Sequence, residues 1–246
     1  MKQFFLILIT LTPLVLLGQE TNKVTEQRCI KCVKEVYYVL KSDPKIRHGL
    51  YQKLGFKDVV LTSGYYKNGL KDSTWTQYDF EGKNKVNTGL YFQDKRVGLW
   101  EFYSPYGELE QKYDYTKDEI SLFLIDENFT KQNCIVINGN NKKEMQLDRP
   151  PLYVGGTSEI FEFLLNKLHY PIEALDNGVS GVVYIALTVD SVGRTRNHRI
   201  EKGIGLGCNE EALRVVKQLP DNWFSGILNG EFVTAEIVLP ITFTIR

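Results

Sequence analysis

The side chains that could do chemistry in this 246-residue chain are few and widely spaced. Cys29 and Cys32 form a CIKC pair, and Cys134 and Cys208 lie far from it in sequence. A CxxC pair does redox chemistry where a strand gives way to a helix, and no strand pattern precedes Cys29. Because an oxidising compartment favours disulfides, a structural disulfide of Cys29 and Cys32 is favoured over a thiol site. The pairing of the four cysteines stays open.

Metal chemistry and acid–base chemistry lack the residue spacing that they need. The three histidines, His48, His169 and His198, are scattered along the chain. A zinc site needs Cys or His ligands at matching spacing, and nucleophilic catalysis needs a base beside the nucleophile. We therefore expect no catalytic residue, no metal, no cofactor and no enzymatic activity. The enzymatic alternative is a thiol enzyme that uses Cys29 and Cys32.

Charge and composition narrow the class of partner. The chain has 30 basic and 30 acidic residues, a formal net charge of zero, and 43% hydrophobic residues. Such a balance, without a basic block, argues against nucleic acid or an anionic membrane surface as the main partner. We expect a protein partner, and a chain long enough for one large domain or two small ones.

The N-terminal segment 1–18 has the three parts of a secretory signal peptide. A lysine precedes a predominantly apolar run from Phe4 to Leu17, and Gly18 follows it. A membrane-spanning helix needs about 20 apolar residues. We therefore expect this segment to be a signal peptide and the protein to be periplasmic or in the cell envelope. The alternative is an uncleaved N-terminus that anchors the chain in the inner membrane, the one case in which membrane association is expected.

A repeat dominates the first half of the chain. Residues 19–60 form an N-terminal region with the cysteine pair, in which VKEVYYVLK (33–41) predicts a short helix. Residues 61–115 then contain GYYKNGLKDSTWTQYDFEG (64–82), which returns as GLYFQDKRVGLWEFYSPYG (89–107) at a constant offset. Each copy predicts a β-hairpin with aromatic strands. Their aromatic face is interpreted as packing between repeats, in preference to a ligand groove.

These hairpins resemble a MORN-type repeat variant of bacterial secreted and antitoxin-like proteins. The resemblance covers roughly residues 50–115, and its pattern departs at Ser73 in the first copy and at Asp94 in the second. It implies an interaction scaffold and does not specify the partner.

The last part of the chain, 150–246, predicts a separate α+β domain after a connecting region at 116–149. Apolar residues at helical spacing predict one helix from Ile160 to Leu168 and another after Asn209 that ends at Pro220. Between Val183 and Val189, apolar residues instead recur at every second position, which predicts a strand. The last stretch of the chain has the same pattern. We expect an antiparallel sheet with two helices packed on one face.

This domain resembles the C-terminal domain of TonB-type energy transducers. The resemblance rests on Tyr170-Pro171-x-x-Ala174, Gly178-x-x-Gly181-x-Val183, Val189-Asp190-x-x-Gly193-Arg194, GIGLGCNEEALRVVKQLP (203–220) and the final VLPITFTI. It implies a periplasmic domain that binds the N-terminal periplasmic segment of an outer-membrane receptor by strand addition. The partner-binding residues that it implies are Tyr170, Pro171, Glu231, Phe232, Val233, Thr234, Ala235, Glu236, Ile237 and Val238. For Tyr170 and Pro171, a purely structural corner at the start of a helix stays open.

The sequence departs from the family in the part that precedes this domain. Energy transducers of this type carry an inner-membrane helix and a long spacer rich in Pro and Lys, whereas this chain has only 8 prolines and carries hairpin repeats there. Partner binding in TonB-dependent transport is therefore better supported than energy transduction. The alternative function is a secreted interaction or immunity scaffold in which the repeats bind the partner.

Overall fold

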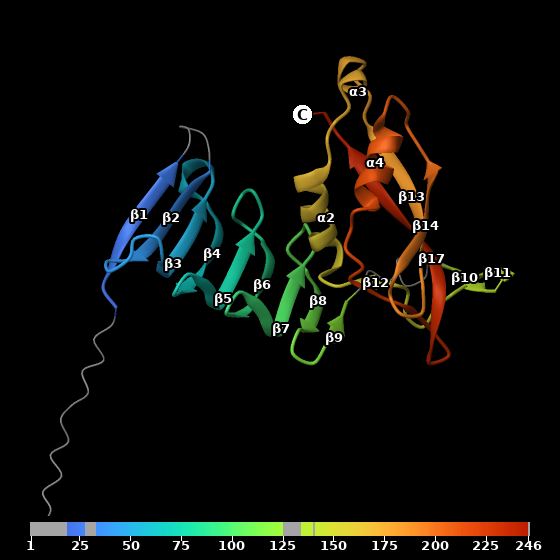
Figure 1. The fold of residues 1–246 in the computed structure, drawn as a ribbon. Coiled ribbons are helices and arrows are strands. Elements are labelled where there is room, and N and C mark those ends of the chain that lie inside the picture. Colours follow the sequence, from blue (N-terminus) through green and yellow to red (C-terminus); the bar gives the residue numbers. More distant parts are fainter. Residues whose placement is uncertain (1–18, 28–32, 125–133, 140, 246) are drawn as a thin grey trace, which may run out of the picture.

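The computed structural model describes residues 19–27, 33–124, 134–139 and 141–245. These residues form a nine-stranded sheet, followed by an α+β part whose larger sheet is antiparallel (Figure 1). The predicted signal peptide (1–18) and the Cys29–Cys32 pair lie outside the described residues, so both stay predictions. Within the described residues, no helix is long and apolar enough to cross a membrane.

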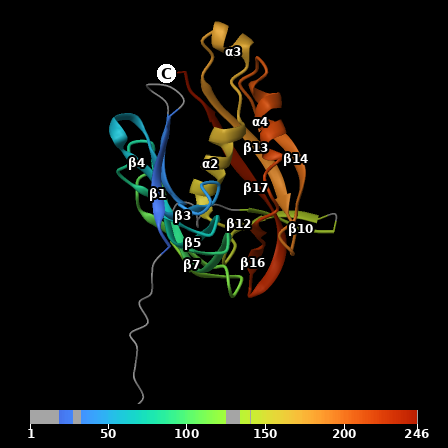
Figure 2. The same cartoon turned by 60° about the vertical axis from the view of Figure 1, so that its left-hand side comes forward.

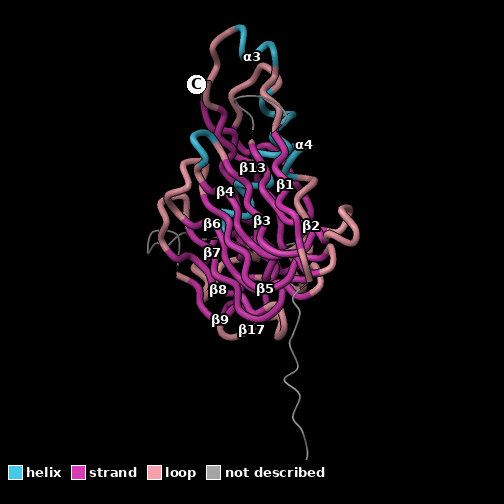
Figure 3. The backbone as a smooth tube through the Cα atoms, turned by 90° about the vertical axis from the view of Figure 1, so that its left-hand side faces the viewer, coloured by secondary structure: helices cyan, strands magenta, loops and turns pink. Residues whose placement is uncertain are grey.

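The nine-stranded sheet is a meander in which each strand pairs antiparallel with the next one along the chain. Figure 3 shows these strands running side by side. A short 3-10 helix, η1 (Phe56–Asp58), interrupts the connection between the third and fourth strands. The strands are β1 (Thr21–Gln27), β2 (Lys34–Leu40), β3 (Arg47–Leu54), β4 (Val60–Lys67), β5 (Leu70–Tyr78), β6 (Lys85–Phe92), β7 (Lys95–Tyr103), β8 (Leu109–Asp114) and β9 (Glu119–Phe123).

The prediction of a short helix at residues 33–41 is wrong, because this segment is strand β2. Its centre is Val36-Tyr37-Tyr38-Val39, and β-branched and aromatic residues favour the pleated backbone of a strand. Both edges of β2 are occupied, by β1 and by β3. Pairing on both sides therefore decides the conformation of a segment whose apolar spacing is ambiguous over so short a length.

The two repeats share the same contact between a glycine and a tryptophan, and this contact recurs at the constant offset between the repeats. Gly64 faces the indole of Trp75, and Gly89 faces the indole of Trp100, so closely that a Cβ at either glycine would overlap the ring. Each indole N–H donates to the carbonyl of the residue after that glycine, at 3.1 Å in the first unit and 3.0 Å in the second. The indoles therefore lie flat on the neighbouring strand, which explains why glycine and tryptophan recur together.

Cations lie over the aromatic rings at three places along this sheet, one in each repeat and one before the first repeat. Arg47 lies 4.4 Å from the ring centre of Tyr37, Lys71 lies 4.5 Å from that of Trp75, and Arg96 lies 4.5 Å from that of Trp100. Cation–π contacts of this kind stabilise by about 0.5–1 kcal/mol at exposed sites. The rings also contact one another edge to face from Tyr66 to Tyr115 along the sheet. The neighbouring rings of the sheet thus bury Trp75, whereas the cluster that contains Trp100 also packs against Val154 and Phe224 from the later part of the chain.

The α+β part begins with a short hairpin and ends with the longest strand of the described residues. Its larger sheet has the order β11-β10-β17-β13-β14, in which every pairing is antiparallel; β16 pairs with β17 off this path, and β12 pairs with β15 separately. The elements are β10 (Cys134–Asn138), β11 (Asn141–Met145), β12 (Leu152–Tyr153), α2 (Gly156–Lys167), α3 (Ile172–Asp176), β13 (Gly181–Val189), β14 (Thr195–Lys202), α4 (Cys208–Val216), β15 (Trp223–Phe224), β16 (Gly226–Leu228) and β17 (Glu231–Phe243).

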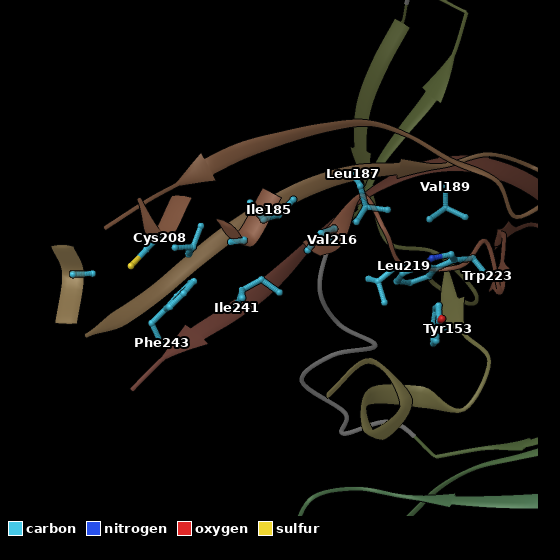
Figure 4. Close-up of a cluster of buried hydrophobic side chains, with 13 residues drawn as sticks. Tyr153, Ile185, Leu187, Val189, Cys208, Val216, Leu219, Trp223, Ile241 and Phe243 are labelled. Atoms are coloured by element: carbon cyan, nitrogen blue, oxygen red, sulfur yellow. The ribbon is translucent and has the colours of Figure 1, made fainter. Parts of the chain in front are cut away.

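One apolar cluster fills the space between this sheet and its helices (Figure 4). Strand β13 contributes Ile185 and Leu187, strand β17 contributes Ile241 and Phe243, and helix α4 contributes Val216. Each of these side chains is at most 1% exposed. In both strands, apolar residues were predicted at every second position. These residues point into this core, and the residues between them point to the opposite face of the sheet.

Helix α2 lies between the nine-stranded sheet and the rest of the α+β part in both Figures 1 and 2. Glu159 on α2 accepts hydrogen bonds from Arg96 at 2.9 Å and from Asn87 at 3.2 Å. Burial raises the pKa of Glu159, and the guanidinium of Arg96 opposes that shift. Gln111 of β8 adds a hydrogen bond to the carbonyl of Tyr153 at 3.1 Å. These polar contacts join the repeats to the last domain.

We expect Gly89→Ala to lower the free energy of unfolding by about 1–3 kcal/mol, because the added methyl would overlap the indole of Trp100 and force an overpacked site to shift. Urea unfolding followed by tryptophan fluorescence measures this difference. Lys95→Ala, at an exposed position of the adjacent strand, is the control and should change stability by less than about 0.5 kcal/mol. Equal stabilities of Gly89→Ala and the unmodified protein would contradict the close contact.

Candidate protein-binding edge

Strand β17 has 13 residues and is longer than the segments that pair with it. Along one side, β13 pairs with it without interruption from Ala235 to Phe243. Strand β10 pairs with Thr234 to Glu236, and β16 pairs with Glu231 to Val233. Among the residues that the structure describes, no strand other than β13 pairs with β17 from Ile237 to Phe243. As far as the described part of the chain shows, half of the strand therefore has a free edge.

Pro240 determines which backbone groups face this free edge. A proline has no N–H, and it fits a strand where its nitrogen faces away from the paired neighbour. Pro240 lies opposite Tyr184 in the regular ladder with β13, so its nitrogen faces the free edge. Because alternate residues of a strand face the same neighbour, Val238 and Thr242 also face outward. The free edge thus offers two N–H groups and three carbonyl oxygens.

The side chains of this stretch divide between the core and the opposite face of the sheet. Leu239, Ile241 and Phe243 belong to the core or pack against it. Val238 is 45% exposed, and Pro240 is exposed as well. The free edge is therefore held straight by a buried row of side chains, while its backbone groups need a partner from solvent or from another chain.

The ten predicted partner-binding residues fall into four places, three of them on β17. Glu231, Phe232 and Val233 pair with β16, whereas Thr234, Ala235 and Glu236 pair with β10. Only Ile237 and Val238 belong to the free stretch. Leu239 to Phe243 are not among the residues predicted from sequence. Pro240, in an otherwise continuous strand pattern, is the sequence signal of an edge strand that points to them.

Tyr170 and Pro171, the remaining two, form a corner beside the end of β17. The ring of Tyr170 lies edge to face against Phe243, with ring centres 5.5 Å apart, and its hydroxyl donates to the carbonyl of Val179. Pro171 precedes α3 with φ of −62°. Tyr170 thus supports Phe243 from the core side, and the two residues have the geometry of a corner at the start of a helix.

Glu236 is the buried carboxylate of β17, and it is fully paired. Arg199 of β14 donates to both of its oxygens, at 2.6 and 2.7 Å, and the Nζ of Lys142 lies 3.5 Å away. The hydrogen bonds from Arg199 hold the pKa of Glu236 below its usual range, although burial opposes this shift. The charge is therefore satisfied within the protein and is not free to bind a partner.

Neither of the two described cysteines has the environment of a reactive thiol. Cys134 and Cys208 are buried and free, and burial raises the pKa of both thiols. Within the described ranges, no group of three or more metal-binding side chains comes together. A cavity of about 540 Å³ opens between the two parts of the molecule beside Tyr113, Trp223 and Phe224. Its lining excludes the free stretch of β17.

We expect Glu236→Gln to lower the free energy of unfolding at pH 7 by about 1.5–3 kcal/mol, because the charged hydrogen bonds from Arg199 lose their acceptor charge. Since the folded pKa of Glu236 is depressed, its contribution is present above the unfolded pKa of about 4.3 and is lost as pH falls through the lower folded value. The stability difference between the two proteins should therefore shrink below about pH 4.

Chemical unfolding at a series of pH values measures this difference. Glu201→Gln is the matched control, because Glu201 also contacts Arg199, at 3.0 Å, but is half exposed; exposed pairs contribute about 0–1 kcal/mol. A pH-independent difference for Glu236→Gln would contradict the assigned cause.

Comparison with known families identifies one segment of the chain. Residues 166–245, about a third of the chain, match the family model of the Gram-negative bacterial TonB protein C-terminal. The match begins inside α2 and includes α3, β13, β14, α4 and β17, and therefore the whole free edge. No curated protein matches the chain, and no solved structure does.

Proposed function

We propose that this protein binds the N-terminal periplasmic segment of an outer-membrane receptor as an added strand on β17. Residues 166–245 carry a TonB C-terminal domain, a non-enzymatic domain of protein interaction in transport across the cell envelope. The observation that carries the proposal is the free edge from Ile237 to Phe243, which lies within the matched segment. The periplasm or cell envelope is the corresponding location.

Strand addition fits the chemistry of this edge. Its affinity comes from main-chain hydrogen bonds, and side-chain pockets contribute selectivity. The outward-facing groups of Val238, Pro240 and Thr242 supply such bonds, and the buried row of β17 keeps them in line. Pro240 also disfavours edge-to-edge pairing of β17 with strands of other proteins, because it leaves the edge with one N–H fewer. The same geometry thus permits a selected partner and discourages aggregation.

The nine-stranded sheet supports a second candidate function, a scaffold in which the repeats bind the partner. Its face opposite the aromatic one carries exposed apolar side chains, because strand residues alternate between faces and these three are next in sequence to rings of the aromatic face. They are Tyr65, Leu90 and Leu99, which are 50%, 46% and 45% exposed. Exposed apolar side chains that adjoin one another in a patch mark binding surfaces. We propose the edge of β17 as the main site because it has unpaired main-chain groups as well as exposed side chains.

Thr242→Pro tests strand addition directly. The substitution removes one outward N–H from the edge and leaves the ladder with β13 in place, since the nitrogen of Thr242 faces away from β13. We expect it to weaken binding of receptor peptides about fivefold or more, because one main-chain hydrogen bond contributes about 1 kcal/mol. Isothermal titration of the full-length protein with synthetic peptides from the N-terminal segments of outer-membrane receptors measures the affinity.

Two further variants separate the rival functions. Thr242→Ala keeps the N–H and should bind like the unmodified protein. Leu90→Glu with Leu99→Glu alters the repeats alone and should leave peptide affinity unchanged. If the repeat variant loses the peptide and Thr242→Pro retains it, the scaffold function is supported and the edge is rejected.

A further inference from the structure

The hairpin of β10 and β11 occupies the same side of β17 on which strand addition is proposed. In an antiparallel ladder, alternate residues bond to the same neighbour, so Thr234 and Glu236 face the same side as Pro240. Their partners are Ile137 and Ile135 of β10. The hairpin is therefore already an added strand at the beginning of this edge, and the free stretch starts where it ends.

Only a short contact holds the hairpin on β17. The pairing covers three residues of each strand, on β10 from Ile135 to Ile137. A small apolar cluster lies beneath it, in which Cys134 is 8% exposed, Leu147 is 6% exposed and Ala235 is fully buried. Lys142, on the far strand of the hairpin, adds an ion pair with Glu236. Figure 1 shows the rest of the hairpin extending away from the sheet.

At each position, one side of a strand can pair with only one other strand, because the N–H and C=O groups on that side all point toward the same neighbour. A partner on β17 can therefore pair with the stretch from Ile237 to Phe243, but it meets the hairpin at Glu236. Without the hairpin, the available edge would extend to Thr234. The hairpin and a longer partner strand compete for Thr234 to Glu236.

We propose that the β10–β11 hairpin is an intramolecular competitor that limits the partner strand to Ile237–Phe243. This inference rests on the proposed function. It makes the protein selective for partner segments that are extended only over the length of that window and then turn away, because additional strand residues find no main-chain groups to pair with. Pro240 lies at the centre of the window and leaves it with two donors, at Val238 and Thr242.

A length series of peptides tests the limit on the unmodified full-length protein. A receptor-derived pentapeptide, heptapeptide, nonapeptide and dodecapeptide are titrated calorimetrically, and the heptapeptide matches the window from Ile237 to Phe243. We expect affinity to rise at least fivefold from the pentapeptide to the heptapeptide, and to change less than twofold from the heptapeptide to the dodecapeptide. A steady rise of affinity up to the dodecapeptide would overturn the proposal, because it would show that the hairpin does not limit the strand.

Release of the hairpin provides the second test. In the observed register, the N–H groups of Ile135 and Ile137 face β17. Ile135→Pro with Ile137→Pro therefore removes the two hydrogen bonds that β10 donates to β17, while the sequence of the hairpin stays otherwise intact. The matched control is Ile135→Ala with Ile137→Ala, which keeps both N–H groups. We expect the proline variant to bind the dodecapeptide at least fivefold more tightly than the heptapeptide, and the alanine variant to show no such preference.

The buried cysteines report whether the hairpin has moved. Cys134 lies in the hairpin cluster and Cys208 in the main core, so alkylation mapped by mass spectrometry should label Cys134 in the proline variant and spare Cys208. If Cys134 is released and the dodecapeptide still gains nothing over the heptapeptide, the inference is wrong and the proposed function stands. If no peptide of any length binds any of these proteins, strand addition itself fails, and the inference fails with it.

Discussion

The structure of the last domain depends on the need of every backbone N–H and C=O group for a hydrogen-bond partner. Strand β17 spans 13 residues, whereas β13 pairs with nine of them, and β10 and β16 together pair with six. The alternating row that ends in Ile241 and Phe243 is buried, so the strand must stay extended over its full length. Along part of β17, the backbone groups on one side have no strand partner among the described residues, and these groups form the free edge.

The aromatic face of the nine-stranded sheet is covered in two ways. Around Trp75 it is covered by neighbouring rings and cations of the same sheet, whereas the cluster of Trp100, Phe102 and Tyr113 also packs against Val154 and Phe224 of the α+β part. Tryptophans lie flat against glycines of the neighbouring strand, and cations lie above the rings. Arg96 lies over Trp100 and also binds Glu159 at the start of α2. A buried ion pair stabilises less than its Coulomb energy suggests, since both groups lose water. Its role is therefore specific placement of α2, whose apolar residues pack in the cluster that supports β17.

Features that depend on local periodicity could be read from the residues alone. The alternation from Val233 to Ile245 indicated the last strand, because a side-chain period of two follows from the pleated backbone. The strand at Val36–Val39 was not recognised, since so short an apolar run has no decisive period. Pro240 carried the signal of an edge, although its meaning depends on which neighbour it faces.

The position of the free edge depends on contacts between distant parts of the chain. Strand β10 lies far before β17 in sequence, and nothing in Cys134–Asn138 indicates which strand it pairs with. That pairing follows from the space left beside β17 after β13 has taken the other side, and from the small cluster around Ala235. The sequence predicts partner binding at Glu231–Val238, whereas the unpaired stretch of the same strand lies further along it, at Ile237–Phe243. Pairing between distant strands has no residue signature, because every residue other than proline can form backbone hydrogen bonds.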